Sequence, residues 1–164
     1  MKRILNSWLI IVFVLSIFAI ASALFAEFVL DLTPCKMCLK QRHPYYLIIL
    51  LIILFNFFKQ TRNIWLYVFI QIFLIYGLFY SIWHIGIENK ILSGPASCSG
   101  TLSQTDSIQN LKQQIANQAI VNCSEITWTI GGLSAATLNS LLLLLILFFN
   151  TMFILQYFYG SKKN

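Results

Sequence analysis

Long apolar blocks alternate with short polar stretches along this chain. The four blocks run from Trp8 to Ala26, from Tyr45 to Phe58, from Ile64 to Ile87 and from Leu138 to Tyr159. A helix needs about 20 apolar residues to cross a hydrocarbon core of about 30 Å, and three of the blocks reach that length. The second block is shorter, so its helix must begin further back, near Cys35. The pattern therefore predicts four transmembrane helices.

The predicted spans and outer loops follow from these blocks. The spans cover about residues 8–28, 35–58, 64–87 and 136–159, and the outer loops cover about residues 29–34 and 88–130. Pro44 falls inside the second span. Proline removes the hydrogen bond to the carbonyl four residues back, that of Lys40, and frees polar backbone near the outer end of the helix. The sequence thus predicts a kink at this point.

Composition excludes a water-soluble domain. Of 164 residues, 59% are hydrophobic and 10% are charged, and the mean hydropathy is +0.78. Soluble domains contain roughly 45 to 50% apolar residues. We therefore expect an all-α membrane protein, a four-helix bundle that forms a single integral-membrane domain over residues 1–164.

The basic residues indicate the orientation. One side carries Lys2, Arg3, Lys59, Arg62, Lys162 and Lys163, and the other carries Lys36, Lys40, Arg42, Lys90 and Lys112. The first set lies in short tails and a short loop, where positive charge marks the cytoplasmic side. All five acids lie on the other side, so both termini are predicted to be cytoplasmic. The net charge of +6 is then explained by the basic residues on the cytoplasmic side and does not indicate nucleic-acid binding.

A cleaved signal peptide is the alternative for the first block. Lys2 and Arg3 precede it, and Ala21-Ser22-Ala23 resembles a cleavage site. The apolar run is longer than the usual signal-peptide core of about 7 to 15 residues, which favours a span. The mass of the intact protein distinguishes the two.

The long outer loop is predicted to carry a short amphipathic helix. Asp106 can cap a helix whose narrow apolar face is formed by Ile108, Leu111, Ile115 and Ala119. This helix is expected either to lie on the outer leaflet or to pack on the loop itself.

The four cysteines all fall in or beside the predicted outer loops. They are Cys35 and Cys38, which form a CxxC motif, and Cys98 and Cys123 in the long loop. All four thiols therefore emerge on the same side, which indicates thiol and disulfide chemistry at a membrane surface. For Cys98 and Cys123, a redox pair, a structural disulfide and a four-cysteine zinc site remain open, although zinc sites usually combine two short-spaced motifs.

The CxxC motif lies at a probable helix start. Thr33 is the expected cap and Pro34 the expected first helical residue, just before Cys35. The free backbone donors of a helix start favour a thiolate, which makes a CxxC disulfide more oxidising.

Arg42 and His84 are ionisable residues inside predicted spans. Cys35, Cys38 and Arg42 are three and four residues apart, so they share one helix face near the outer surface. Arg42 can stabilise a Cys38 thiolate or bind a carbonyl oxygen of a ligand, or it can extend to the lipid headgroups. His84, about one turn inward of Glu88, either contacts a ligand or hydrogen-bonds a neighbouring helix.

Taken together, these residues resemble the DsbB family of disulfide-bond-formation membrane proteins. The resemblance covers nearly the whole chain and consists of four spans, Cys35-Lys36-Met37-Cys38 followed by Arg42, a cysteine pair in the second outer loop, and the segment from Trp128 to Asn139. It implies a bacterial inner-membrane enzyme with its cysteines on the periplasmic side. Two departures are the basic Lys36-Met37 dipeptide and Gln41, which stands where an acid can precede the arginine.

The resemblance also implies roles. Cys98 and Cys123 would oxidise a DsbA-like protein of the thioredoxin fold, with Cys98 forming the mixed disulfide. Cys35 and Cys38 would pass the electrons to a membrane quinone, ubiquinone or menaquinone, beside Arg42 and His84. No metal site is expected.

Two other functions compete with this interpretation. The vitamin K epoxide reductase family also has four spans, two cysteine pairs and a quinone, but its loop pair precedes the CxxC motif, whereas here the loop pair follows it. A non-enzymatic scaffold or transporter component with disulfide-stapled outer loops would show inert disulfides and no dependence on quinone.

Overall fold

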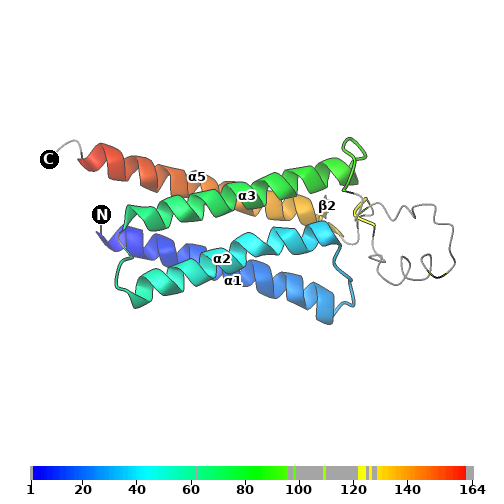
Figure 1. Ribbon diagram of the computed structural model, residues 1–164, viewed down its shortest axis with the longest axis horizontal. Coiled ribbons are helices and arrows are strands. Elements are labelled where there is room, and N and C mark those ends of the chain that lie inside the picture. The colour runs from blue at the N-terminus through cyan, green and yellow to red at the C-terminus, as the bar shows by residue number, and fades with distance from the viewer. Residues whose placement is uncertain are drawn as a thin grey trace.

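Four long helices make up most of the chain. The computed structural model describes residues 2–61, 63–95, 98, 109, 122–124, 126 and 129–161. The helices are α1 (Lys2–Phe28), α2 (Lys36–Phe57), α3 (Ile64–Glu88) and α5 (Ala135–Ser161), and the strands are β1 (Thr129–Ile130) and β2 (Leu133–Ser134) (Figure 1). The predicted amphipathic helix from Asp106 to Ala119 lies outside the described residues, apart from Gln109.

All four helices are long and apolar enough to cross a membrane. The candidate spans are Ser7–Phe28, Lys36–Phe57, Ile64–Glu88 and Ala135–Phe158. Most of their outward side chains are large and apolar, as a lipid-facing surface requires. The prediction of an all-α membrane protein with four spans is confirmed.

The helices run side by side as one bundle. The start of α1, the end of α5 and the α2–α3 connection lie at one end, and the start of α2, the end of α3 and the start of α5 lie at the other (Figure 1). Packing is most extensive between α3 and α5 and between α2 and α3, and α1 packs mainly on α2. The helix order therefore brings the CxxC motif to the same end of the bundle as His84 and the Cys98–Cys123 pair.

A short hairpin precedes the last helix. β1 and β2 pair antiparallel, and the two residues between them, Gly131 and Gly132, have φ angles of 60° and 82°. Positive φ at both turn positions is the geometry that favours glycine in a two-residue hairpin. Ser134, at the end of β2, accepts a hydrogen bond from the backbone N–H of Thr137 at 3.3 Å and so caps α5.

The helix α2 continues through Pro44, which is buried against α3. The closest approach is at Gly77, where an added Cβ would lie 2.8 Å from Pro44 Cγ and 3.2 Å from Leu143 Cδ1. Only glycine leaves room for α2, α3 and α5 to meet at this point.

A polar cluster lies inside the half of the bundle far from the cysteines. Asn150 is fully buried and donates to Tyr67 O at 3.0 Å and to Gln71 Oε1 at 2.7 Å. It also accepts a hydrogen bond from the Trp8 indole at 3.4 Å, and Gln71 donates to Thr151 Oγ1 at 2.8 Å. These bonds connect α1, α3 and α5 within an otherwise apolar core.

Candidate active site at the start of α2

Cys35 caps α2 through its own sulfur. Its backbone is extended, with φ −71° and ψ 164°, and Sγ accepts a hydrogen bond from the Cys38 N–H at 3.2 Å. The sulfur atoms of Cys35 and Cys38 lie 2.9 Å apart, within hydrogen-bond distance. The predicted helix start at Thr33 and Pro34 is therefore wrong by two residues, because the cysteine sulfur takes the capping position expected for the threonine hydroxyl.

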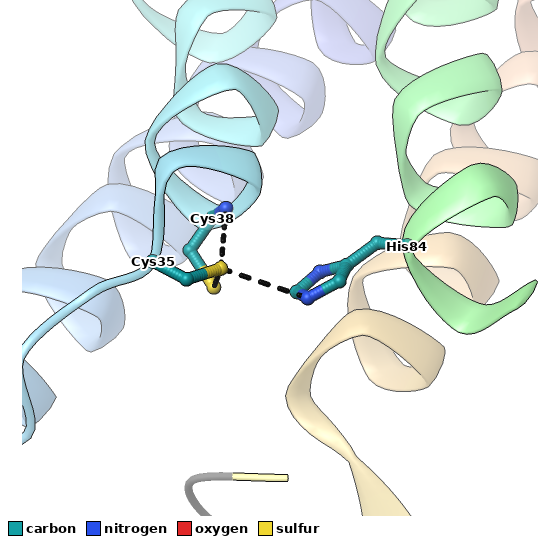
Figure 2. Close-up of side chains that lie close together, drawn as sticks. All are labelled: Cys35, Cys38 and His84. Carbon is teal, nitrogen blue, oxygen red and sulfur yellow. Dashed lines mark hydrogen bonds between the residues drawn. The ribbon is translucent and has the colours of Figure 1, made fainter. Parts of the chain in front are cut away.

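His84 approaches the same sulfur from α3. Its Nε2 lies 3.6 Å from Cys35 Sγ, and the side chains point toward each other across the gap between the two helices (Figure 2). Cys35 precedes the first residue of the span and is buried. The hydrogen bond shared with Cys38 lowers the pKa of the Cys35 thiol well below its ordinary value; burial opposes this shift, and the hydrogen bond with His84 adds to it. The site thus favours a thiolate at Cys35.

The Cys35 thiolate is expected to persist in acid. An ordinary cysteine has a pKa of about 8.5, and a group whose pKa is lowered on folding stabilises the protein above that value and loses this contribution as the pH falls through the lowered pKa. The free energy of unfolding of the reduced protein should therefore rise with pH from acid to neutral more than that of the oxidised protein. Ultraviolet absorbance of the thiolate should remain in the reduced chain at neutral pH and disappear in Cys35→Ser. A thiolate that forms only in the ordinary range would contradict the assignment.

Polar side chains of α2, α3 and α5 hold the other side of the His84 ring. Gln41 Nε2 lies 2.8 Å from His84 Nδ1, and Gln41 Oε1 accepts from Asn139 Nδ2 at 3.1 Å. Asn139 also donates to Ser81 Oγ at 2.7 Å and accepts from the Tyr45 hydroxyl at 2.6 Å. Sequence reasoning missed Gln41 and Asn139 as site residues, although a polar amide inside an apolar span was the available signal.

Glu88 also belongs to this site. Its side chain is only 7% exposed, with Oε1 3.9 Å from His84 Nε2, and Oε2 accepts a hydrogen bond from Ser134 Oγ at 2.6 Å. The same serine caps α5, so the end of α3 is tied to the start of α5 beside the histidine. In the sequence Glu88 only marked the end of a span, because nothing there showed that the chain returns to cover it.

The long-loop cysteines form a disulfide beside the CxxC motif. Cys98 and Cys123 are joined, whereas Cys35 and Cys38 are free thiols. One buried apolar cluster, which we call the outer cluster, contains Cys35, Met37, Ile87, Cys98 and Cys123, with Cys38, Tyr80 and Trp83 packed against it. His84 also hydrogen-bonds the backbone of Cys123. The structure therefore brings both cysteine pairs into one place, which is the arrangement that disulfide exchange between them requires.

Arg42 faces a different neighbour. Its guanidinium forms an ion pair with Glu27 of α1 and donates to the carbonyl of Ala23 at 3.3 Å. Among the described residues, the hydrogen bonds of Arg42 thus run to α1, whereas those of His84 run to Gln41 of α2, to Cys35 and to Cys123. The structure places both residues near the CxxC motif but on opposite sides of it. Glu27, the partner of Arg42, was not identified from the sequence.

Three possible metal-binding atoms lie close together. The sulfur atoms of Cys35 and Cys38 and a ring nitrogen of His84 are all within 4.8 Å of one another. Coordination by Nε2 would need a lone pair on that nitrogen. Nε2 lies nearest to Cys35 Sγ and Glu88 Oε1, two groups that accept a hydrogen. The polar surroundings therefore suit a histidine that donates to sulfur better than a histidine that binds a metal.

Comparison with known proteins identifies related sequences. The family model described as "Disulfide bond formation protein DsbB" matches residues 5–153. The chain is 30% identical over 149 residues to "Uncharacterized protein RP370" of Rickettsia prowazekii (strain Madrid E), a match that covers 90% of this chain and 84% of the relative. No solved structure matches the chain.

Proposed function

Because this chain belongs to the DsbB family, whose members are membrane oxidoreductases of disulfide formation, we propose that it reoxidises a DsbA-like dithiol protein and passes the electrons to a membrane quinone. The observation that carries the proposal is the outer cluster, in which a Cys98–Cys123 disulfide and the Cys35/Cys38 dithiol lie together. A structural staple would have no need of a free CxxC dithiol at its side.

The topology that we propose is that of a bacterial inner-membrane protein with both termini in the cytoplasm and the cysteines facing the periplasm. It is supported by the clustering of all four cysteines beside the start of α2, which lies at the end of the bundle opposite the start of α1 and the end of α5 (Figure 1). The periplasm is an oxidising compartment, where such disulfides form and persist.

The first step concerns the loop disulfide. A thiolate of the partner attacks the sulfur of Cys98, the Cys98–Cys123 bond breaks, and Cys123 leaves as a thiolate. The second partner thiolate then attacks the mixed disulfide and releases Cys98, so that the partner leaves with a disulfide and the chain holds two more thiols. The partner is oxidised by two electrons and the loop pair is reduced by two.

The second step passes these electrons to the CxxC pair. In the oxidised enzyme Cys35 and Cys38 form a disulfide, which the loop dithiol attacks; the loop disulfide forms again and Cys35 and Cys38 become thiols. The proximity of the two pairs in the outer cluster supports this exchange. His84, within 3.6 Å of Cys35, is placed to stabilise the thiolate that leaves when the CxxC disulfide opens.

The residues near Cys38 fit a quinone. Arg42 stands one helical turn after Cys38, and a guanidinium offers five N–H donors, of which Glu27 and Ala23 leave some free for a carbonyl oxygen. Cys38 is only partly buried, unlike the other three cysteines. When bound here, a quinone would supply an acceptor for two electrons and two protons, which would let Cys35 and Cys38 return to a disulfide. Arg42 would hold it, and Cys38 would face it.

A strongly oxidising acceptor is needed on energetic grounds. A dithiol poised like thioredoxin, at about −270 mV, cannot oxidise a partner at about −120 mV, since the gap of roughly 150 mV corresponds to about 7 kcal/mol. Charges at a helix terminus contribute only about 0.3 to 2 kcal/mol each. The helix start at Cys35 therefore cannot close the gap without an acceptor that removes the electrons.

Glu27→Gln is expected to raise the KM for quinone about three- to tenfold with kcat nearly unchanged, because the guanidinium of Arg42 loses the charge-assisted hydrogen bond that orients it. Steady-state quinone reduction measures both constants. Asp31→Asn is the matched control, since it removes the same charge from the α1–α2 connection and Asp31 makes no ion pair among the described residues. Its φ of 52° also suits asparagine. Equal changes in both variants would contradict a specific role for Glu27.

The proposed function is tested by mixing the purified protein in detergent with a reduced thioredoxin-like protein and following quinone absorbance. We expect the absorbance of the oxidised quinone to fall in proportion to the partner oxidised. If the quinone stays oxidised across several partners and quinones, the stapled-scaffold function replaces this one.

A further inference from the structure

We propose that Gln41 is a positioning residue that fixes the hydrogen of the neutral His84 ring on Nε2, so that the histidine donates to the sulfur of Cys35. The importance of Cys35 rests on the proposed function, but the position of the hydrogen is a property of the folded chain that can be measured without any activity.

The direction of each hydrogen bond follows from the chain of side chains that leads to the ring. The Tyr45 hydroxyl donates to Asn139 Oδ1 at 2.6 Å, and the amide nitrogen of Asn139 faces Gln41. That nitrogen donates to Gln41 Oε1 at 3.1 Å and to Ser81 Oγ at 2.7 Å. Turning the Asn139 amide alone would set two oxygens against each other at Gln41. Turning both amides would put the hydrogen of the neutral ring on Nδ1 and leave Nε2 without one beside Cys35 Sγ and Glu88 Oε1, which both accept. The oxygen of Gln41 therefore accepts from Asn139 of α5, and its amide nitrogen faces His84.

The orientation of the Gln41 amide determines which ring nitrogen of His84 carries the hydrogen. An amide NH₂ group only donates, so Nδ1, at 2.8 Å from it, must present a lone pair. A neutral imidazole has one N–H, which is then on Nε2. Among the described residues, the groups beside Nε2 accept hydrogen bonds: they are Cys35 Sγ at 3.6 Å and Glu88 Oε1 at 3.9 Å. An acid in place of Gln41 would instead accept a hydrogen from Nδ1.

Nuclear magnetic resonance of the nitrogen-15-labelled full chain in detergent tests this assignment, because the shift of a ring nitrogen reports whether it carries hydrogen. The chain has two histidines, and His43→Gln removes the exposed one and leaves the His84 signals alone. We expect hydrogen on Nε2 and none on Nδ1. In Gln41→Glu a hydrogen should appear on Nδ1. Asn139→Asp should have the same effect without a change at Gln41, since an acceptor at 139 turns the Gln41 amide around.

The matched control is Gln71→Glu. Gln71 accepts from Asn150 of α5 and donates to Thr151, so its oxygen, like that of Gln41, accepts from an asparagine of α5, but it lies far from His84. It should leave the His84 shifts unchanged. Hydrogen on Nδ1 in the unsubstituted chain, or an equal change in Gln71→Glu, would overturn the inference.

Quinone reduction measured on the same preparations separates the two proposals. Hydrogen on Nε2 in a chain that reduces no quinone supports the positioning role of Gln41 and overturns the proposed function. Hydrogen on Nδ1 in a chain that does reduce quinone overturns the role of Gln41 alone.

Discussion

Cys98→Ser and Cys35→Ser are each expected to reduce quinone reduction to the uncatalysed background, but at different steps. Without Cys98 the partner has no loop disulfide to attack, and the partner does not react directly with the CxxC pair in the proposed path, so not even one equivalent of partner should be oxidised. Without Cys35 the Cys98–Cys123 disulfide is intact, so one equivalent of partner is oxidised and the reaction then stops. The amount of partner oxidised per protein in a single mixing experiment therefore distinguishes the two variants.

Met37→Leu is the control for these variants. Met37 is buried in the same outer cluster, and a swap of similar volume is tolerated at a cost below about 1.5 kcal/mol. It should retain turnover, which would show that the losses come from sulfur chemistry rather than from disturbed packing. Turnover that survives in Cys35→Ser would refute electron transfer through the CxxC motif.

Gly77→Ala is expected to destabilise the bundle and to impair catalysis. Alanine normally favours a helix interior over glycine by about 1 kcal/mol, but here its Cβ would meet the rigid ring of Pro44 at 2.8 Å. Overpacking of this kind costs about 1 to 3 kcal/mol, so a net loss is expected. If α2 and α3 move apart to make room, Cys35 and Gln41 move away from His84, which lies two turns further along α3.

The thermal unfolding midpoint in detergent and the rate of quinone reduction measure both effects. Gly86→Ala is the paired substitution on the same helix, where the added Cβ would lie 2.6 Å from the end of Leu92, an exposed side chain that can turn away. Its midpoint should stay the same or rise slightly. If both variants behave alike, the close approach of α2 and α3 at Pro44 is not what makes Gly77 necessary.

The sequence predicts the fold well and the site only in part. Each span is visible because lipid demands about 20 apolar residues in a row, whatever the neighbouring helices are. The same uniform hydrophobicity hides the rotation of each helix about its axis, since no polar face marks the outside. For this reason neither the Gln41–His84 contact nor the Asn139–Ser81 contact was predictable.

The charged residues show the same limit. Glu27 and Glu88 both lie near the outer end of a predicted span, and in the sequence they looked like acids of the outer surface. The structure pairs Glu27 with Arg42 and covers Glu88 with Ser134. Which acid is paired depends on which distant segment of the chain packs against it. Residue spacing in the sequence does not show this. The CxxC motif, by contrast, is local, and its place at the start of α2 was predicted to within two residues.

The buried amide of Asn150 acts on the distant cysteines through the rigidity of a helix. Within lipid, apolar helix surfaces can slide along one another at little cost, because hydrocarbon side chains and lipid tails are equivalent surroundings. Asn150 removes that freedom, since a shift of α5 by one residue, about 1.5 Å, would separate it from Tyr67 and Gln71. Asn139 stands on the same helix about three turns away, so its height opposite Gln41 is set from the opposite half of the membrane. The position of α5 along its own axis, which Asn150 fixes, therefore also determines the geometry of the redox site at the other end of the bundle.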